Sequence, residues 1–295
     1  SIRRSRRQTQ RRWSSGGCDA RFLGTVAFDG RVVIGEGEKD QAPMLFNGER
    51  VGTGTGPACD IAVDPIDGTS LAASGRPNAL SMIAVAERGA MLDASSVFYM
   101  DKIVSGPEGA GVIEIDKPIG ENIRALAAAL GKPVAEMEVS VLDRPRHLEL
   151  IQQIREAGAH TRLLSDGDVA GAISAAGLDG TSDLCVGVGG SPEGIVTACA
   201  VTALGGYMQA RLHPRNEKET RRGLDAGLRM DAVFEASDLV KGDNTIFVAT
   251  GVTDGIIVDG VRRRGNILRT ESIILRGRSG TIRRIVADHR IEKWV

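Results

Sequence analysis

The residues of this chain whose types and spacing best suit chemistry are two aspartates at the end of an apolar segment. Asp64 and Asp67 lie in the run DIAVDPIDGT at residues 60–69, where we expect Pro65 to end a strand and bend the chain. Carboxylates at a strand end are costly unless positive charge lies against them, and a hard divalent cation takes such oxygen ligands. Asp-Pro and Asp-Gly pairs are also common in ordinary turns, so a structural interpretation stays open.

The two residues that follow these aspartates fit a phosphate group. Gly68 and Thr69 stand where a helix could begin. The unpaired backbone N–H groups at the start of a helix suit a phosphate oxygen. Together with the aspartates, they predict a site for metal and phosphate.

A second acidic segment lies upstream. The apolar run 31–35 predicts a short buried strand, and Glu36 follows it between two glycines. We expect Glu36 to be a candidate metal ligand, whereas the nearby Lys39 and Asp40 fit a solvated turn. Two strands that end in acids are typical of phosphatases in which paired cations activate water and neutralise phosphoryl oxygens.

Two arginines after another expected strand fit a second phosphate. Arg144 and Arg146 flank a proline directly after the strand expected at 139–142. Guanidinium groups bind phosphate bidentately, and ligands of α/β sheets collect beyond strand ends. The alternative is an exposed helix start in which an arginine pairs with Asp143 or Glu149.

Two aspartates occur in a similar place after the strand expected at 161–164. Asp166 and Asp168 flank a glycine, and carboxylates there can accept hydrogen bonds from sugar hydroxyls. Either one also fits the N-cap of a helix that begins at Val169. Both interpretations stay open from the residues alone.

The loop GVGGSPEG at 187–194 follows a further expected strand. Its glycines, Gly190 among them, allow backbone N–H groups to approach a ligand closely, and Pro192 fits the first turn of the next helix. Glu193 in that turn fits a surface acid stabilised by the helix dipole.

The order and spacing of these segments resemble those of the bacterial class II fructose-1,6-bisphosphatases. DPIDGT alone is shared with inositol monophosphatases and other lithium-sensitive sugar phosphatases, so the full series carries the resemblance, from about Val26 to the C-terminus. The matching segments are IGEGEKDQAPML, DIAVDPIDGTSLAASGRPNALSMIAVAERG, LDRPRH, DGDVA, GVGGSPEG and SGTIRRI.

The resemblance implies hydrolysis of the 1-phosphate of fructose 1,6-bisphosphate in gluconeogenesis, with Mg²⁺ or Mn²⁺ as the cofactor and a homodimer or homotetramer as the assembly. It implies that Asp67 and Thr69 are catalytic, Thr69 by orienting the attacking water or supporting the leaving group. The implied metal ligands are Glu36, Asp64, Asp67 and Glu193. The implied substrate-binding residues are Gly68, Thr69, Tyr99, Arg144, Arg146, Asp166, Asp168 and Gly190.

Other functions fit parts of the same sequence. Sedoheptulose 1,7-bisphosphate differs from the proposed substrate by one carbon and keeps both phosphates, so sequence does not separate the two activities. An inositol monophosphatase would not need the LDRPRH segment. A chain that binds sugar phosphate without turnover is the alternative from another class.

The first 21 residues differ from the rest of the chain. They are rich in arginine and serine without apolar periodicity, so we expect disorder. Such a segment also fits a nucleic-acid-binding arm or a transit peptide. The family has there a helical segment with a lysine and a metal-binding aspartate. We therefore expect residues 22–295 to form the catalytic unit, preceded by unrelated sequence of the kind that a shifted reading frame produces, and activity to be impaired.

Composition excludes several classes of protein. A net charge of −1 gives no general attraction to nucleic acid or anionic membranes, and no apolar run approaches the roughly 20 residues of a membrane span. Cys59, Cys185 and Cys199 lie in apolar runs, and Cys18 adds no paired spacing for a metal. We expect buried reduced thiols and a cytosolic protein.

The elements that must position these residues alternate between strands and helices. This alternation predicts an α/β protein, and the resemblance implies layered α/β/α/β/α architecture with mixed sheets and a subdomain seam near 106–136. Expected strands are 31–34, 60–63, 80–86, 139–142, 161–164, 183–186, 207–212, 245–249, 272–275 and 281–286. Expected helices are 121–130, 146–157, 169–176, 192–204 and 217–227.

Overall fold

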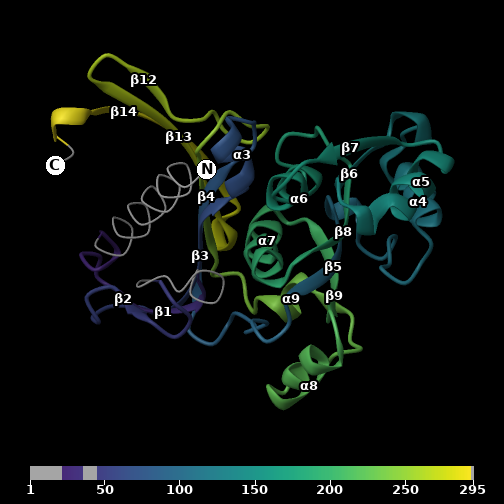
Figure 1. Ribbon diagram of the computed structural model, residues 1–295, viewed down its shortest axis with the longest axis horizontal. Helices are drawn as coiled ribbons and strands as arrows, with labels where there is room; N and C mark the ends of the chain where they lie inside the picture. Colours follow the sequence, from purple (N-terminus) through teal and green to yellow (C-terminus); the bar gives the residue numbers. More distant parts are fainter. Residues whose placement is uncertain (1–21, 36–44, 294–295) are drawn as a thin grey trace, which may run out of the picture.

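The computed structural model describes residues 22–35 and 45–293, and it contains two mixed β-sheets with helices between and beside them (Figure 1). In these residues the first sheet has the strand order β12-β13-β11-β4-β3-β1-β2, with β14 paired to β13. Strands β1 and β3 are parallel, and the other pairs are antiparallel. Its strands are β1 (Asp29–Ile34), β2 (Arg50–Val51), β3 (Ala58–Asp67), β4 (Leu80–Glu87), β11 (Ile246–Gly251), β12 (Arg262–Arg264), β13 (Ile267–Arg276) and β14 (Thr281–Arg290).

The second sheet has the order β10-β9-β5-β8-β6-β7 within the described residues. Strand β6 runs parallel to β7 and β8, whereas β5 is antiparallel to both of its neighbours. The strands are β5 (Tyr99–Ser105), β6 (Glu138–Leu142), β7 (His160–Leu164), β8 (Leu184–Gly190), β9 (Tyr207–His213) and β10 (Phe234–Glu235).

Seven α-helices lie in the described ranges, and four of them form two layers. Helices α6 and α7 lie between the two sheets, and α4 and α5 cover the outer face of the second sheet (Figure 1). The class of α/β protein with mixed sheets is therefore confirmed, and the described residues supply four of the expected layers as β/α/β/α. The helices are α3 (Thr69–Ser74), α4 (Ile119–Leu130), α5 (Leu148–Glu156), α6 (Val169–Ala175), α7 (Ser191–Leu204), α8 (Glu217–Asp225) and α9 (Ala236–Leu239).

The position of α7 follows from its sequence. SPEGIVTACAVTAL is apolar on nearly all sides, as expected of a helix that has a sheet on each face. Its side chains pack with those of both sheets in one core, which includes Met82 from β4 and Met100 from β5. A second core joins α4 and α5 to the other face of the second sheet. The site residues at the start of α7 are thus held by the largest core.

Most expected elements are confirmed to within a few residues, but the central strand β5 was not expected. Its sequence YMDKIVS contains neighbouring charged residues, which break the apolar pattern of a buried strand. The seam proposed near 106–136 and the boundary at residue 21 stay predictions, the second because residues 1–21 lie outside the described part. Cys59, Cys185 and Cys199 are buried and free, as expected.

Candidate active site

Asp64 and Asp67 reach one face of the first sheet because β3 is irregular. The expectation that Pro65 ends the strand is wrong, since β3 continues to Asp67. Asp64 pairs with Met82 and Asp67 with Leu80, so three steps on β3 oppose two steps on β4. Side chains three apart on a regular strand face opposite sides, and the extra residue of this bulge restores the same side.

The Asp67 carboxylate lies against the loop that follows β7 in the other sheet. A Cβ built on Gly167 would stand 2.6 Å from Oδ2 of Asp67. Asp67 is 7% exposed, and its Oδ2 has no hydrogen-bond partner among the described residues. Burial, and then the charges of Asp64, Glu193 and other acids, raise the pKa of Asp67 well above its usual value. Excess negative charge of this kind favours a bound cation.

Glu193 joins these aspartates from the first turn of α7. A Cβ on Gly190 would overlap Oε2 of Glu193, so a larger residue at 190 would displace this carboxylate from its present position. Glu193 and Asp64 line one cavity of about 440 Å³, together with Gly35, the residue that follows β1. Glu193 is therefore not the isolated surface acid that its position in a helix start also allowed.

The donor set fits a divalent cation in its chemistry. Asp64, Asp67 and Glu193 offer the carboxylate oxygens that Mg²⁺ and Mn²⁺ prefer, and the orphaned Oδ2 of Asp67 needs a positive partner. Within the described residues, no group of three His, Cys, Asp or Glu side chains lies close enough to hold a metal ion without rearrangement. Glu36, the fourth expected ligand, lies outside the described residues.

Gly68 and Thr69 follow the bulge as expected. Gly68 is buried with φ 75°, which favours glycine, and α3 begins at Thr69. Ser70 in the first turn of α3 donates a hydrogen bond to Asp166. The segment after Asp67 and the loop after β7 therefore form one surface.

Arg144 binds this loop directly. Its guanidinium forms an ion pair of 2.8 Å with Asp166 and donates to the Ser165 carbonyl at 2.6 Å. The partner is neither the Asp143 carboxylate nor Glu149, the two acids considered from sequence. Arg144 and Asp166 thus meet in one place, although the sequence analysis assigned Arg144 to the distal phosphate and Asp166 to sugar hydroxyls.

Arg146 and Tyr99 lie together on the outer face of the second sheet. The Arg146 guanidinium stands 4.9 Å from the Tyr99 ring centroid and donates two hydrogen bonds to the Val188 carbonyl, at 2.7 and 3.1 Å. The adjacent His147 is 2% exposed; its Nδ1 donates to the Leu142 carbonyl and its Nε2 accepts from the Val188 N–H. This histidine holds the strand segment to which Arg146 is bound.

Asp168 stands at the N-cap of α6, but its side chain does not cap the helix. Instead it forms an ion pair of 2.5 Å with Lys102 of β5, and both residues are buried. The capping interpretation of Asp168 is therefore wrong. Lys102 was missed from sequence, because nothing in YMDKIVS marks this lysine as buried.

The cavity beside Asp64 and Glu193 is also lined by a charged cluster that the sequence analysis did not identify. Arg215 and Arg222 line it, and both pair with Glu219, which is 1% exposed. Two arginines share one glutamate, so this group of three contributes net positive charge to the lining. The segment HPRNEKET at 213–220 gave no signal beyond an expected helix from 217.

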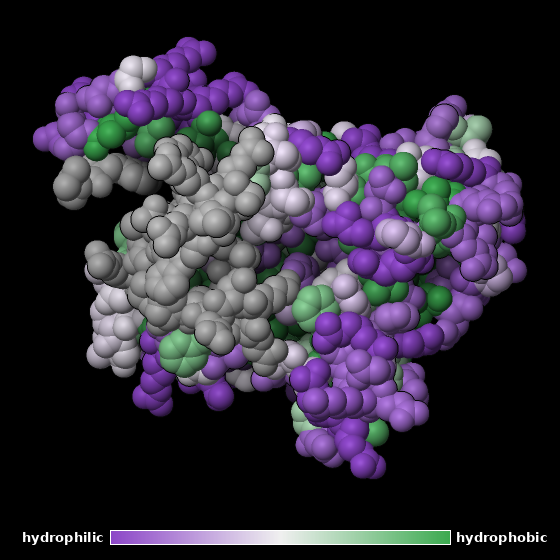
Figure 2. Space-filling model, viewed as in Figure 1, coloured by the Kyte–Doolittle hydropathy of each residue, from purple (hydrophilic) through white to green (hydrophobic). Residues whose placement is uncertain are grey.

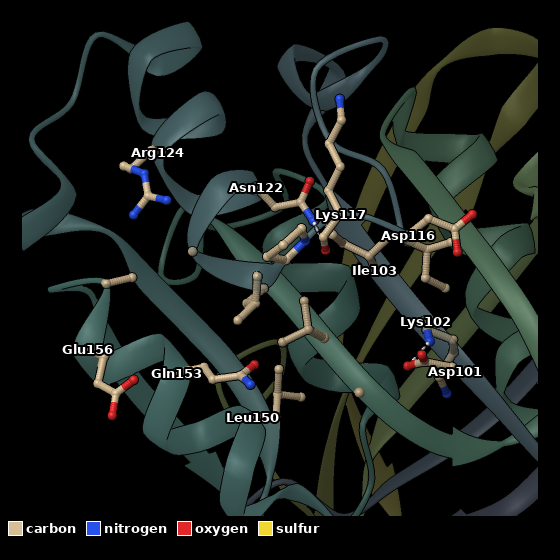
Figure 3. A pocket seen from close by; sticks show the side chains of 17 residues that line it. Asp101, Lys102, Ile103, Asp116, Lys117, Asn122, Arg124, Leu150, Gln153 and Glu156 are labelled. Carbon is tan, nitrogen blue, oxygen red and sulfur yellow. Dashed lines mark hydrogen bonds between the residues drawn. The ribbon is translucent and has the colours of Figure 1, made fainter.

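A larger cavity of about 670 Å³ lies between α4, α5 and the outer face of β5 (Figure 3). Figure 3 shows Arg124 on one side and Gln153 and Glu156 on the other, with Asp101 at the far end. None of the expected site residues lines it. The candidate active site thus lies beside this cavity, and Lys102, which lines the cavity, also pairs with Asp168 of the site. No helix in the described residues is long and apolar enough to cross a membrane.

Comparisons with known proteins agree with the arrangement of these segments. The profile of a family described as "Bacterial fructose-1,6-bisphosphatase, glpX-encoded" matches residues 18–289. Similar curated proteins include fructose-1,6-bisphosphatase 1 class 2 of Escherichia coli (strain K12) and fructose-1,6-bisphosphatase class 2 of Shigella flexneri. Each is 43% identical over 285 residues, which cover 92% of this chain and 84% of the relative.

Proposed function

The chain belongs to the family of bacterial, glpX-encoded fructose-1,6-bisphosphatases, and we propose that it hydrolyses the 1-phosphate of fructose 1,6-bisphosphate to give fructose 6-phosphate and phosphate. The family resemblance found in the sequence is thereby confirmed. The observation that carries the proposal is the meeting of Asp67 with the loop around Gly167, which joins the acidic strand end to the loop expected to bind sugar.

Membership of the family implies a metal-dependent phosphatase, and we assign Mg²⁺ or Mn²⁺ as the ion. Asp64, Asp67 and Glu193 would hold it, with Glu36 as a further ligand. A divalent cation in such a site lowers the pKa of a bound water and neutralises phosphoryl oxygens.

The residues of the chain then bind and orient the substrate. Gly68 and Thr69 hold the 1-phosphate, and the Thr69 hydroxyl orients water or supports the leaving oxygen. A hydroxyl has too high a pKa to act as a base without a partner, so orientation is its role. Positioning of this kind supplies much of the rate enhancement in phosphoryl transfer.

The remaining residues select a bisphosphate. Tyr99, Arg144 and Arg146 contact the distal phosphate, and the carboxylates of Asp166 and Asp168 accept hydrogen bonds from sugar hydroxyls. The present pairs Arg144–Asp166 and Lys102–Asp168 support these roles, since they hold the carboxylates at fixed positions before substrate arrives. Gly190 leaves room for Glu193 and for close approach of substrate.

Assembly and location complete the proposal. We assign a homo-oligomer, a dimer or tetramer, because Ile282, Ile285 and Val286 of β14 are 49%, 44% and 59% exposed. Figure 2 also shows hydrophobic surface along one side of the hairpin formed by β13 and β14. The free cysteines support a bacterial cytoplasm as the location.

Phosphate release from fructose 1,6-bisphosphate, with Mn²⁺, with Mg²⁺ and with chelator, tests the function. Turnover that requires the cation supports it. Faster turnover of sedoheptulose 1,7-bisphosphate would move the assignment to that sugar. Calorimetric binding of fructose 6-phosphate without any turnover would show an inactive chain. The absence of both binding and turnover would overturn the proposal.

A further inference from the structure

Lys102 is the only lysine or arginine among the described residues that is buried, with 5% of its surface exposed. It belongs to the central strand β5, and its neighbours on the same face are Met100 and Val104, which pack in the main core. An ammonium group in such surroundings is strongly unfavourable unless it is paired. Its position therefore needs an explanation beyond packing.

The partners of Lys102 come from the candidate active site. Its Nζ lies 2.5 Å from Oδ2 of Asp168, the carboxylate expected to bind a sugar hydroxyl. Glu193, an expected metal ligand, is close enough to act on the same ammonium. The lysine thus lies between residues of two different elements, the loop before α6 and the first turn of α7.

The backbone around the ammonium is shaped for this contact. A Cβ on Gly189 would overlap Oδ2 of Asp168 and stand 2.8 Å from Nζ of Lys102. Any side chain at residue 189 would separate the pair or push it aside. Burial alone would lower the pKa of Lys102, but the Asp168 charge and hydrogen bond outweigh it and the pKa is raised, so the lysine stays charged.

We propose that Lys102 is a positioning residue for the phosphatase reaction. It fixes the Asp168 carboxylate for the sugar and offsets the negative charges of Asp168 and Glu193. This inference rests on the proposed function. The Asp168 side chain makes no cap to α6, so the lysine is its partner among the described residues. Without that ammonium, the carboxylate would rotate away from the sugar or repel the neighbouring acids.

The test compares Lys102→Met, a neutral side chain of similar length, with Lys132→Met as a matched control. Lys132 forms an ion pair of 2.7 Å with Asp183 away from the site. We expect Lys102→Met to raise KM and the Kd of fructose 6-phosphate at least about tenfold, since removing one member of a buried ion pair costs more free energy than a tenfold change represents. Lys132→Met should leave both constants near the wild-type values.

A double-mutant cycle separates positioning from general stability. If Lys102 acts through Asp168, adding Lys102→Met to Asp168→Asn should weaken fructose 6-phosphate binding little further. Additive losses would overturn the inference, as would a Lys102→Met protein with lowered Tm but unchanged Kd. Lys102→Gln, which keeps a donor without the charge, takes its place under the same criteria if the methionine variant does not fold.

The two proposals fail in different ways. A wild-type chain that neither hydrolyses the bisphosphate nor binds fructose 6-phosphate overturns the proposed function, and the role of Lys102 falls with it. A wild-type chain that binds normally, beside a Lys102→Met protein that binds equally well, overturns only the role of Lys102.

Discussion

The carboxylate of Asp67 lies against the Cα of Gly167, which joins the end of β3 in one sheet to the loop after β7 in the other. A Cβ at residue 167 would stand 2.6 Å from Oδ2 and 3.1 Å from Oδ1 of Asp67. These distances are shorter than ordinary contacts between heavy atoms. The candidate site therefore depends on the absence of a side chain at this one position.

Gly167→Ala should consequently impair activity more than stability. Gly180 is a matched control, because its φ of 67° equals that of Gly167 within two degrees, but a Cβ there would meet nothing within 4 Å. Both alanine variants should lose about 1–2 kcal/mol of folding stability, because alanine is strained in the left-handed backbone conformation. Only Gly167→Ala should displace Asp67, which we expect to lower kcat/KM roughly 100-fold. Similar activity in the two variants would contradict this contact.

Asp67→Asn should have opposite effects on turnover and stability. If Asp67 holds the cation as proposed, its loss should lower kcat at least about 100-fold, since even the residues that support metal ligands are worth 10 to 100-fold. Burial and neighbouring acids raise the pKa of Asp67. Its folded-state pKa lies above the unfolded value of about 3.9, so ionisation destabilises the fold as pH rises through the folded pKa.

In chelator at neutral pH, Asp67→Asn should therefore melt at a higher temperature than the wild type, and this difference should shrink toward pH 4. Thermal denaturation across that range measures it. Asp116→Asn, which removes an exposed acid paired with Arg211, serves as the control and should show no such rise. Equal melting curves for wild type and Asp67→Asn would contradict the repulsion among these carboxylates.

The sequence predicted the acidic strand end but not the way in which it is built. Asp64 and Asp67 were expected near one ion because Pro65 would end the strand; instead β3 continues, and a bulge turns both side chains to one face. A bulge depends on the register with β4, which residues 60–69 alone do not reveal. The residue types were sufficient to predict an acidic metal site, whereas the bulge could be found only from the pairing of β3 with β4.

For strand β5, the sequence did not predict even the existence of the element. Its Asp101 and Lys102 broke the apolar pattern, so the strand was not expected, although it lies at the centre of the second sheet. Lys102 is tolerated inside because Asp168, from a distant segment, neutralises it. Local patterns predict elements whose burial is apolar, but a charge buried against a distant partner has no local signature.

Arg146→Lys should raise KM with little change in kcat. Two hydrogen bonds to the Val188 carbonyl and the Tyr99 ring fix Arg146, so its guanidinium is already ordered for its proposed contact with the distal phosphate. Lysine keeps the charge but loses the planar fork, which should cost roughly tenfold in KM. Steady-state kinetics measure the change. Arg155→Lys in the last turn of α5 is the control, and a fall in kcat alone would argue against the binding role.

His147 should make stability depend on pH in a definite direction. Burial and then the Arg146 charge lower its pKa, against the opposing hydrogen bond to Leu142. The neutral ring donates from Nδ1 and accepts from the Val188 N–H at Nε2, an acceptor that protonation removes. The unfolded imidazole, with a pKa near 6.5, binds more protons than the folded one, so stability should fall as pH falls below about 6.5.

Removing the imidazole tests this dependence. Between pH 7.5 and pH 5.5, the wild-type Tm should fall more than the Tm of His147→Gln, because glutamine retains polar atoms but does not titrate. His160→Gln, at an exposed position, is the control and should keep the wild-type slope. Arg146 also donates to the Val188 carbonyl, so the KM for the bisphosphate should rise in the wild type as pH falls over the same range. Identical dependence of Tm on pH for wild type and His147→Gln would show that His147 does not cause the pH dependence of stability.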